Sequence, residues 1–287
     1  MNPIEILSIS AIIIFTAMQN ILKKGYLKNG GKGVFTFSAL TVITACIFFL
    51  CMSIGNASFS PEVIPYVIGF AGGYTAATVF NFLALGAGPL SLTSLFLSYS
   101  LLIPTAYGLI FDGDEIGIFL IIGLLLLAVS LFLINGGGKE GEGKVTLKWF
   151  ILALLALIGN GVCATFQSVQ SKTFEGRYDS IFMVLALTIV AVFLISMTLI
   201  KERELILPSL KSGVILMVFA GISNGIVNML VMVCSKSIDK SLLFPLISAG
   251  GIVVAWIVSM FFYKEKLSLK QNIGMILGVA SIVFLNL

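Results

Sequence analysis

The stretch Phe111–Asn135, FDGDEIGIFLIIGLLLLAVSLFLIN, and the stretch Phe262–Asn286, FYKEKLSLKQNIGMILGVASIVFLN, are two versions of one pattern at an offset of 151 residues. Identical residues coincide at this offset, among them Gly123 with Gly274, and Ser130 with Ser281. Nearly every other pair in the apolar part is aliphatic in both copies. A duplicated hydrophobic half is typical of secondary transporters, which bind substrate where the two halves meet.

The composition indicates that lipid is the solvent for most of the chain. Of its 287 residues, 59% are hydrophobic and 10% are charged, with a mean hydropathy of +1.12. A soluble domain carries about 25% charged residues. The net charge of +4 is spread over the loops, and no face combines clustered Lys and Arg with aromatic residues. We therefore expect a lipid bilayer and no nucleic acid among its partners.

The residues needed for metal or acid–base chemistry are missing from the apolar segments. The chain has no His, and its four Cys lie inside apolar runs without a CxxC motif. A His-containing zinc site and a His-based catalytic triad are therefore excluded. No carboxylate lies in the middle of an apolar run, which argues against a paired-acid enzyme. We expect neither an enzyme nor a bound cofactor or metal.

The apolar runs predict an all-α membrane protein with ten transmembrane helices, because a crossing needs roughly 20 apolar residues. The predicted spans are about 4–22, 33–54, 62–85, 89–110, 115–134, 149–170, 180–200, 210–234, 241–262 and 269–286. The least apolar stretch, residues 135–148, is rich in Gly and divides the chain near its middle. We predict a first five-helix repeat in 1–134, a linker in 135–148 and a second five-helix repeat in 149–287.

Five crossings per repeat would place the second repeat upside down relative to the first. The basic residues agree with this: loops after odd-numbered helices hold 13 Lys and Arg, and loops after even-numbered helices hold 4. Such opposite bias is what inverted repeats produce under the positive-inside rule. The same rule places the basic loops in the cytoplasm and both termini outside.

The closing pattern FFYKEKLSxxQxxGxxLG at Phe261–Gly278, with ten helices in a 5+5 repeat, resembles the EamA-type permeases of the drug/metabolite transporter superfamily. The resemblance implies a central cavity lined by helices 1, 3, 4, 6, 8 and 9, and movement of a small metabolite by alternating access. The opening MNP and the apolar run to Lys23 resemble the small multidrug resistance proteins. Those proteins carry a glutamate in mid-helix 1, where this chain has Ile12–Ile14. Ten-helix relatives usually keep both termini in the cytoplasm, contrary to the charge count.

Polar side chains inside the spans are the candidate substrate ligands, because buried polar groups in a bilayer are costly unless they are paired or line a wet cavity. We predict that six amides hydrogen-bond a polar substrate near the midplane: Gln19, Asn81, Asn160, Gln167, Asn224 and Asn228. Aromatic walls are expected from Tyr74, Tyr99 and Trp256. The alternative is that these groups only join helices to one another.

These patterns predict a secondary transporter of a small polar or zwitterionic, amino-acid-like metabolite in a prokaryotic plasma membrane, acting as a monomer or homodimer. One alternative is a carrier of organic cations such as choline, held by cation–π contacts. Another is a non-transporting membrane scaffold or sensor. A transporter should have a wet central cavity lined by the amides, whereas a scaffold should pair its amides with one another in a dry core.

Overall fold

The computed structural model describes residues 3–54, 58–107, 110–111, 118–135, 146–234, 240–264 and 267–284. Within these ranges every regular element is a helix, which confirms the all-α prediction for this part of the chain. The α-helices are α1 (Pro3–Lys28), α2 (Val34–Ser53), α3 (Ile64–Ala87), α4 (Leu90–Ser98), α5 (Leu102–Tyr107), α6 (Ile118–Asn135), α7 (Leu147–Thr173), α8 (Asp179–Lys201), α9 (Ile206–Cys234), α10 (Lys240–Phe261) and α11 (Leu269–Phe284).

Six helices of the described residues are long and apolar enough to cross a membrane: α1, α2, α3 with its leading turn, α7, α8 and α9 with its leading turn. The predicted fourth span is instead two helices, α4 and α5, separated by the 3-10 turn Tyr99–Leu101. Pro104 follows this turn and has no N–H to donate to the carbonyl of Ser100, which interrupts the helical ladder. The chain is a multi-pass membrane protein, and ten crossings remain a prediction.

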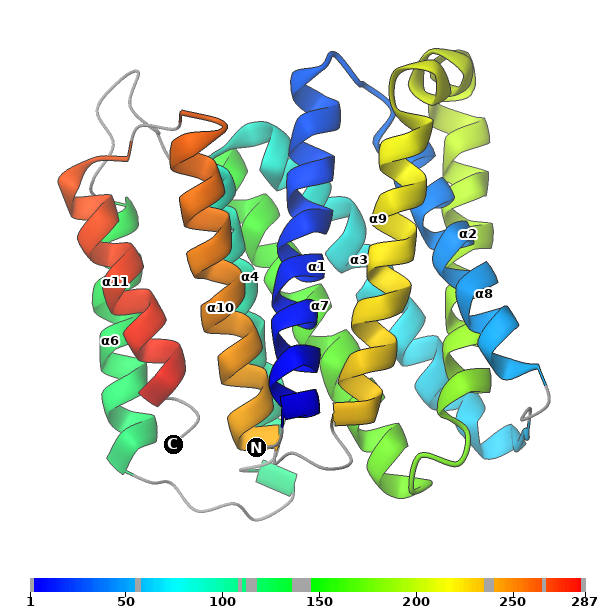
Figure 1. Ribbon diagram of the computed structural model, residues 1–287, viewed down its shortest axis with the longest axis horizontal. Helices are drawn as coiled ribbons and strands as arrows, with labels where there is room; N and C mark the ends of the chain where they lie inside the picture. Colours follow the sequence, from blue (N-terminus) through cyan, green and yellow to red (C-terminus); the bar gives the residue numbers. More distant parts are fainter. Residues whose placement is uncertain are drawn as a thin grey trace.

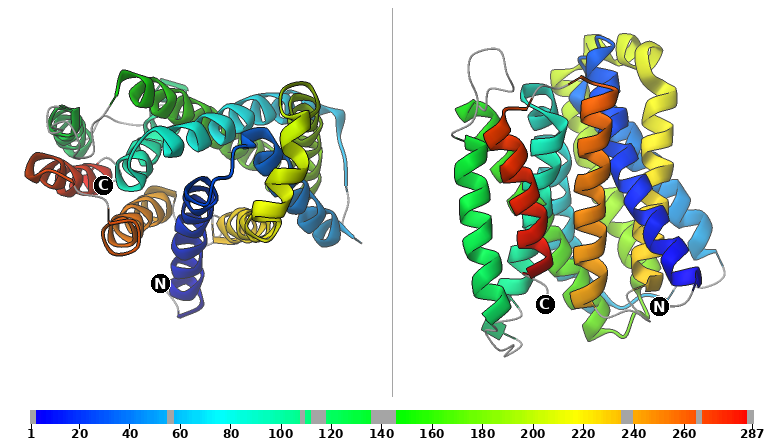
Figure 2. Two further views of the ribbon diagram at one scale, coloured as in Figure 1. Left: turned by 90° about the horizontal axis from the view of Figure 1, so that it is seen from above. Right: turned by 60° about the vertical axis from the view of Figure 1, so that its left-hand side comes forward.

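The helices stand side by side, and α1 begins at the same end of the bundle at which α11 ends (Figure 1). Helices α6 and α11 pack together at one extremity of the elongated cross-section, and α2 and α8 pack together near the other (Figure 2). Between these pairs, α3 packs along α7 and α1 packs along α9. The strongest packing therefore joins elements from the two predicted repeats.

The contact between α6 and α11 joins the two stretches that resemble each other in sequence. Ser130 Oγ donates a hydrogen bond to the carbonyl of Gly274 at 2.7 Å, and Ser281 Oγ donates to the carbonyl of Gly123 at 2.9 Å. The order of the partners is reversed along the two helices, so α6 and α11 run antiparallel.

Glycines allow α3 and α7 to approach with their backbones in contact. A Cβ built on Gly73 would lie 2.8 Å from the nitrogen of Cys163 and 2.8 Å from the carbonyl oxygen of Gly159. A Cβ on Gly159 would lie 2.6 Å from the nitrogen of Ala77. Small residues are enriched at membrane helix interfaces for this reason.

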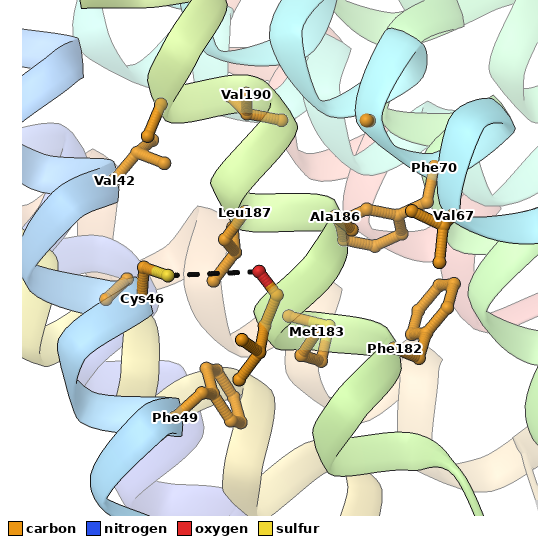
Figure 3. Packing of buried hydrophobic residues seen from close by; sticks show 14 of the residues in the cluster. Val42, Cys46, Phe49, Val67, Phe70, Phe182, Met183, Ala186, Leu187 and Val190 are labelled. Atoms are coloured by element: carbon orange, nitrogen blue, oxygen red, sulfur yellow. Dashed lines mark hydrogen bonds between the residues drawn. The ribbon is translucent and has the colours of Figure 1, made fainter. Parts of the chain in front are cut away.

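The largest apolar cluster lies between α2, α3 and α8, where Phe49, Phe70 and Leu187 are fully buried (Figure 3). The thiol of Cys46 faces the carbonyl of Val184 at 3.8 Å in this cluster (Figure 3). Other large apolar side chains stay exposed on the outer faces of the predicted spans, including Ile68 on α3 at 61%. An outer surface of this kind suits contact with lipid chains.

The predicted linker 135–148 lies largely outside the described residues, as do the acidic loop residues 112–115. At its end, the Thr146 hydroxyl accepts a hydrogen bond from the backbone N–H of Trp149 and caps α7. A threonine N-cap satisfies one of the N–H groups that a helix start leaves unpaired. The repeat boundaries at 134 and 149 remain predictions.

Candidate functional site

Four of the predicted residues form one hydrogen-bonded group, the amide hub, which consists of Gln19, Tyr74, Asn224 and Asn228. Asn224 Nδ2 donates to Gln19 Oε1 at 3.0 Å, and Asn224 Oδ1 accepts from the Tyr74 hydroxyl at 2.9 Å. Asn228, one turn further along α9, donates through Nδ2 to the Asn224 carbonyl at 2.9 Å and to its Oδ1 at 3.3 Å. The hub thus joins α1, α3 and α9.

Asn81 lies on α3 seven residues beyond Tyr74, so both side chains fall on one face of that helix. Asn81 Nδ2 donates to Asn20 Oδ1 at 3.0 Å, while its own Oδ1 is buried and has no hydrogen-bond partner among the described residues. Sequence reasoning missed Asn20. Its position beside Gln19, as a second amide in an apolar helix, was the available signal.

Asn160 and Gln167 lie two turns apart on α7, outside the hub. Asn160 is exposed and donates through Nδ2 to Ser100 Oγ at 2.7 Å, next to the break between α4 and α5. Gln167 is half-buried. Ser100 was also missed from the sequence, because its contact with Asn160 depends on the 3-10 turn Tyr99–Leu101 that separates α4 from α5.

Tyr99 and Trp256 belong to a separate apolar cluster around α4, α7 and α11. The Tyr99 hydroxyl donates to Ser130 Oγ at 3.0 Å. Trp256 packs against this cluster, and its Nε1 is buried without a hydrogen-bond partner in the described part of the chain. Of the three aromatic residues predicted to line the site, Tyr74 is therefore the one that belongs to the hub.

A pocket of about 390 Å³ lies between α5 and α7. Its lining consists of Pro104, Tyr107, Thr165, Ser168, Val169, Lys172 and Thr173. None of the nine predicted site residues lines this pocket. Hydroxyls and one lysine give it a polar wall near the end of the bundle at which α1 begins.

Acidic side chains buried in the described residues lie at helix ends. The Glu202 carboxylate follows α8 and accepts from the backbone N–H groups of Phe35 at 3.1 Å and Thr36 at 2.9 Å, and from the Thr36 hydroxyl at 3.0 Å. It thereby caps the start of α2. Across the described ranges, no three His, Cys, Asp or Glu side chains gather closely enough to hold a metal ion.

Comparison with known proteins finds a family match for the second half of the chain. Residues 148–287 match the model of the EamA-like transporter family. No curated protein sequence matches the chain. A crystal structure of a protein 16% identical in sequence superposes with a TM-score of 0.67, covering 99% of this chain and 96% of the other. At that identity the likeness establishes the fold alone.

The family match over residues 148–287 confirms the resemblance drawn from the closing motif at Phe261–Gly278, which lies within that range. Residues 148–287 therefore match a family of the drug/metabolite transporter superfamily, and together with the long apolar helices this match supports a multi-pass membrane protein.

Proposed function

We propose that this protein is a secondary transporter that moves a small polar or zwitterionic, amino-acid-like metabolite across the plasma membrane by alternating access. The observation that carries the proposal is the amide hub. Asn224 belongs to the predicted second repeat, whereas Gln19 and Tyr74 belong to the first, so the hub bridges the two repeats. Transporters built from repeats bind substrate at that junction.

The packing of the helices supports an inverted repeat. The hydrogen bonds between α6 and α11 occur twice with the partners exchanged, as a twofold axis perpendicular to these helices would require. The first helices of the two predicted repeats are α1 and α7, and the third helices are α3 and α9. Helix α1 packs along α9 just as α7 packs along α3, so the first helix of each repeat contacts the third helix of the other. In such a design, alternating access is a rocking of one repeat against the other around a fixed site.

The side chains of the hub can exchange their mutual hydrogen bonds for hydrogen bonds to a substrate. Each amide carries donors and an acceptor, so it can bind an ammonium, a hydroxyl or a carboxylate. An unpaired buried polar group costs roughly 1–3 kcal/mol. The mutual hydrogen bonds of the hub avoid that cost, and a polar substrate would replace them with hydrogen bonds of its own.

The same hydrogen bonds favour a second candidate, the non-transporting scaffold, for which amides paired with one another were the expected feature. The organic-cation carrier receives less support. Tyr74, the aromatic residue at the hub, stacks on Phe70 with ring centroids 5.5 Å apart and 20° between the planes. One face of the Tyr74 ring is therefore already covered and cannot hold a cation.

Reconstitution of the full chain into liposomes would test these candidates. We expect uptake or counterflow of at least one radiolabelled L-amino acid, and loss of that flux in Asn224→Ala. Uptake of choline alone would favour the cation carrier. If no amino acid or choline enters the liposomes or raises the melting temperature of the purified protein, the transport proposal is wrong and the scaffold stands.

A further inference from the structure

Lys23 is a buried cation for which the described structure supplies no counter-charge. The side chain is 7% exposed, and no carboxylate of the described residues pairs with it. Burying an ammonium group is strongly unfavourable unless an opposite charge compensates it. The neighbouring Lys24 differs, because its Nζ donates to the carbonyls of Leu85 at 2.9 Å and Gly88 at 2.6 Å, at the end of α3.

The position of Lys23 connects it to the amide hub. On α1, Lys23 follows Gln19 by four residues and Asn20 by three, so it lies one turn beyond both on the same side of the helix. Gln19 bonds to Asn224 on α9, and Asn20 bonds to Asn81 on α3. Viewed down the axis of α1, Lys23 therefore lies between Gln19 and Asn20 and faces the junction of α9 and α3.

An oxygen atom of Asn81 on α3, close to this junction, also lacks a hydrogen-bond partner among the described residues. Asn81 binds Asn20 through Nδ2, whereas its Oδ1 is buried and has no partner among the described residues. Within the described part of the chain, a cation without a counter-charge and an acceptor without a donor therefore flank Asn20. A carboxylate would satisfy the cation, and an ammonium group would satisfy the acceptor.

We propose that Lys23 Nζ binds the carboxylate of the substrate and that Asn81 Oδ1 accepts from its ammonium group. The substrate class is then a zwitterion with a free carboxylate, such as an α-amino acid. This inference rests on the transport function proposed above and narrows it. A carboxylate bound to Lys23 forms a charge-assisted hydrogen bond, which is stronger than a neutral one. A choline-like cation would instead meet a second positive charge.

Binding to the purified full chain tests this assignment without any substitution. The probes are the proteinogenic L-amino acids, and for each binder its methyl ester, its α-amide and the corresponding decarboxylated amine, with choline as a further probe. We expect the free amino acid to raise the melting temperature and the three analogues to bind at least about tenfold more weakly, because they lack the negative charge. Equal binding of acid and ester would overturn the inference.

Substitutions at Lys23 provide a second test of the assignment. Lys23→Gln should weaken binding of the same amino acid by about tenfold or more, and Lys23→Arg should retain most of it. Lys32→Gln is the matched control, because Lys32 is exposed near the same end of the bundle. Without ligand, Lys23→Gln should melt no lower than the parent, since it removes an uncompensated buried charge.

The outcomes separate this inference from the transport proposal. If Lys23→Gln binds amino acids with the parent's affinity, Lys23 merely extends toward the membrane interface, and the inference is wrong while transport stands. If choline binds and no amino acid does, the inference also fails and a cation carrier remains. Should Lys23→Gln not fold, the analogue series on the parent protein decides alone.

Discussion

Ser130 and Ser281 occupy equivalent positions in α6 and α11, and each donates a hydrogen bond to a glycine carbonyl of the opposite helix. The acceptors, Gly274 at 2.7 Å and Gly123 at 2.9 Å, are themselves equivalent. The same serine–glycine contact thus occurs twice, with the roles of the two helices interchanged, and this supports a local twofold axis between the helices. The axis is the geometric element that an inverted-repeat transporter requires.

The two serines should differ in their contribution to stability. Ser281→Ala removes one interhelical hydrogen bond, which averages about 0.6 kcal/mol in membrane proteins. Ser130→Ala should lower the melting temperature more, because it also deprives the buried Tyr99 hydroxyl of its acceptor. Ser196→Ala is the control, since that exposed hydroxyl donates to the Val192 carbonyl of its own helix. A larger effect at Ser281 than at Ser130 would contradict this prediction.

The glycine pair on α3 allows a one-residue comparison. Gly73→Ala should destabilise the protein by roughly 1–3 kcal/mol, because the new Cβ meets the backbone of α7 and forces the helices apart. Gly72→Ala should be neutral or stabilising, since nothing lies within 4 Å of its Cβ position and Ala favours helix by about 1 kcal/mol. Thermal melting of both variants measures the difference, and equal losses would argue against direct α3–α7 backbone contact.

The Glu202 carboxylate ties the end of α8 to the start of α2. Glu202→Gln should lower the free energy of unfolding by about 1–3 kcal/mol, because a charged acceptor of three hydrogen bonds becomes neutral and turns an N–H₂ group toward backbone N–H donors. Glu204→Gln is the matched control, as that side chain is exposed two residues away. The melting temperatures of the two variants should differ clearly; similar values would mean that the cap contributes little.

Asn81→Ala and Asn228→Ala should each abolish or strongly impair transport while the protein still inserts. An amide that binds substrate leaves the substrate group unpaired when removed, which weakens affinity by about tenfold or more. Asn224→Ala should abolish flux and also lower the melting temperature most of the three, because it leaves both Gln19 and Tyr74 without their partner. A variant that melts several degrees lower yet binds substrate like the parent would identify its residue as structural.

The orientation in the membrane can be decided by cysteine labelling in a background without Cys46, Cys51, Cys163 and Cys234. The basic end of the bundle should face the cytoplasm under the positive-inside rule. An impermeant thiol reagent should therefore label Ser58→Cys in whole cells and Asn29→Cys after lysis, since both positions are exposed at opposite ends of the bundle. The reverse pattern would mean that both termini lie in the cytoplasm, as is usual for ten-helix relatives.

Several features of the site follow from local sequence. The four-residue spacing of Asn224 and Asn228 placed them on one face of a helix, and the structure links them by hydrogen bonds. The partners across helices were not predictable in the same way. Asn20 bonds to Asn81, and Ser100 to Asn160, because of how neighbouring helices are rotated and shifted against one another. The hydrogen bond from the Tyr99 hydroxyl to Ser130 was likewise not predictable, and a role of Tyr99 in binding substrate stays a prediction.

By itself, the sequence determined the helical class, the lipid environment and the aligned stretches Phe111–Asn135 and Phe262–Asn286, because apolar length and periodicity depend on neighbouring residues alone. The tertiary structure decided which polar groups meet, that Lys23 is buried, and that Asn81 Oδ1 has no partner among the described residues. Those outcomes depend on helix rotation and spacing, as in the backbone contact of Gly73 with Gly159. They arise from packing between residues far apart in the chain, which no local pattern encodes.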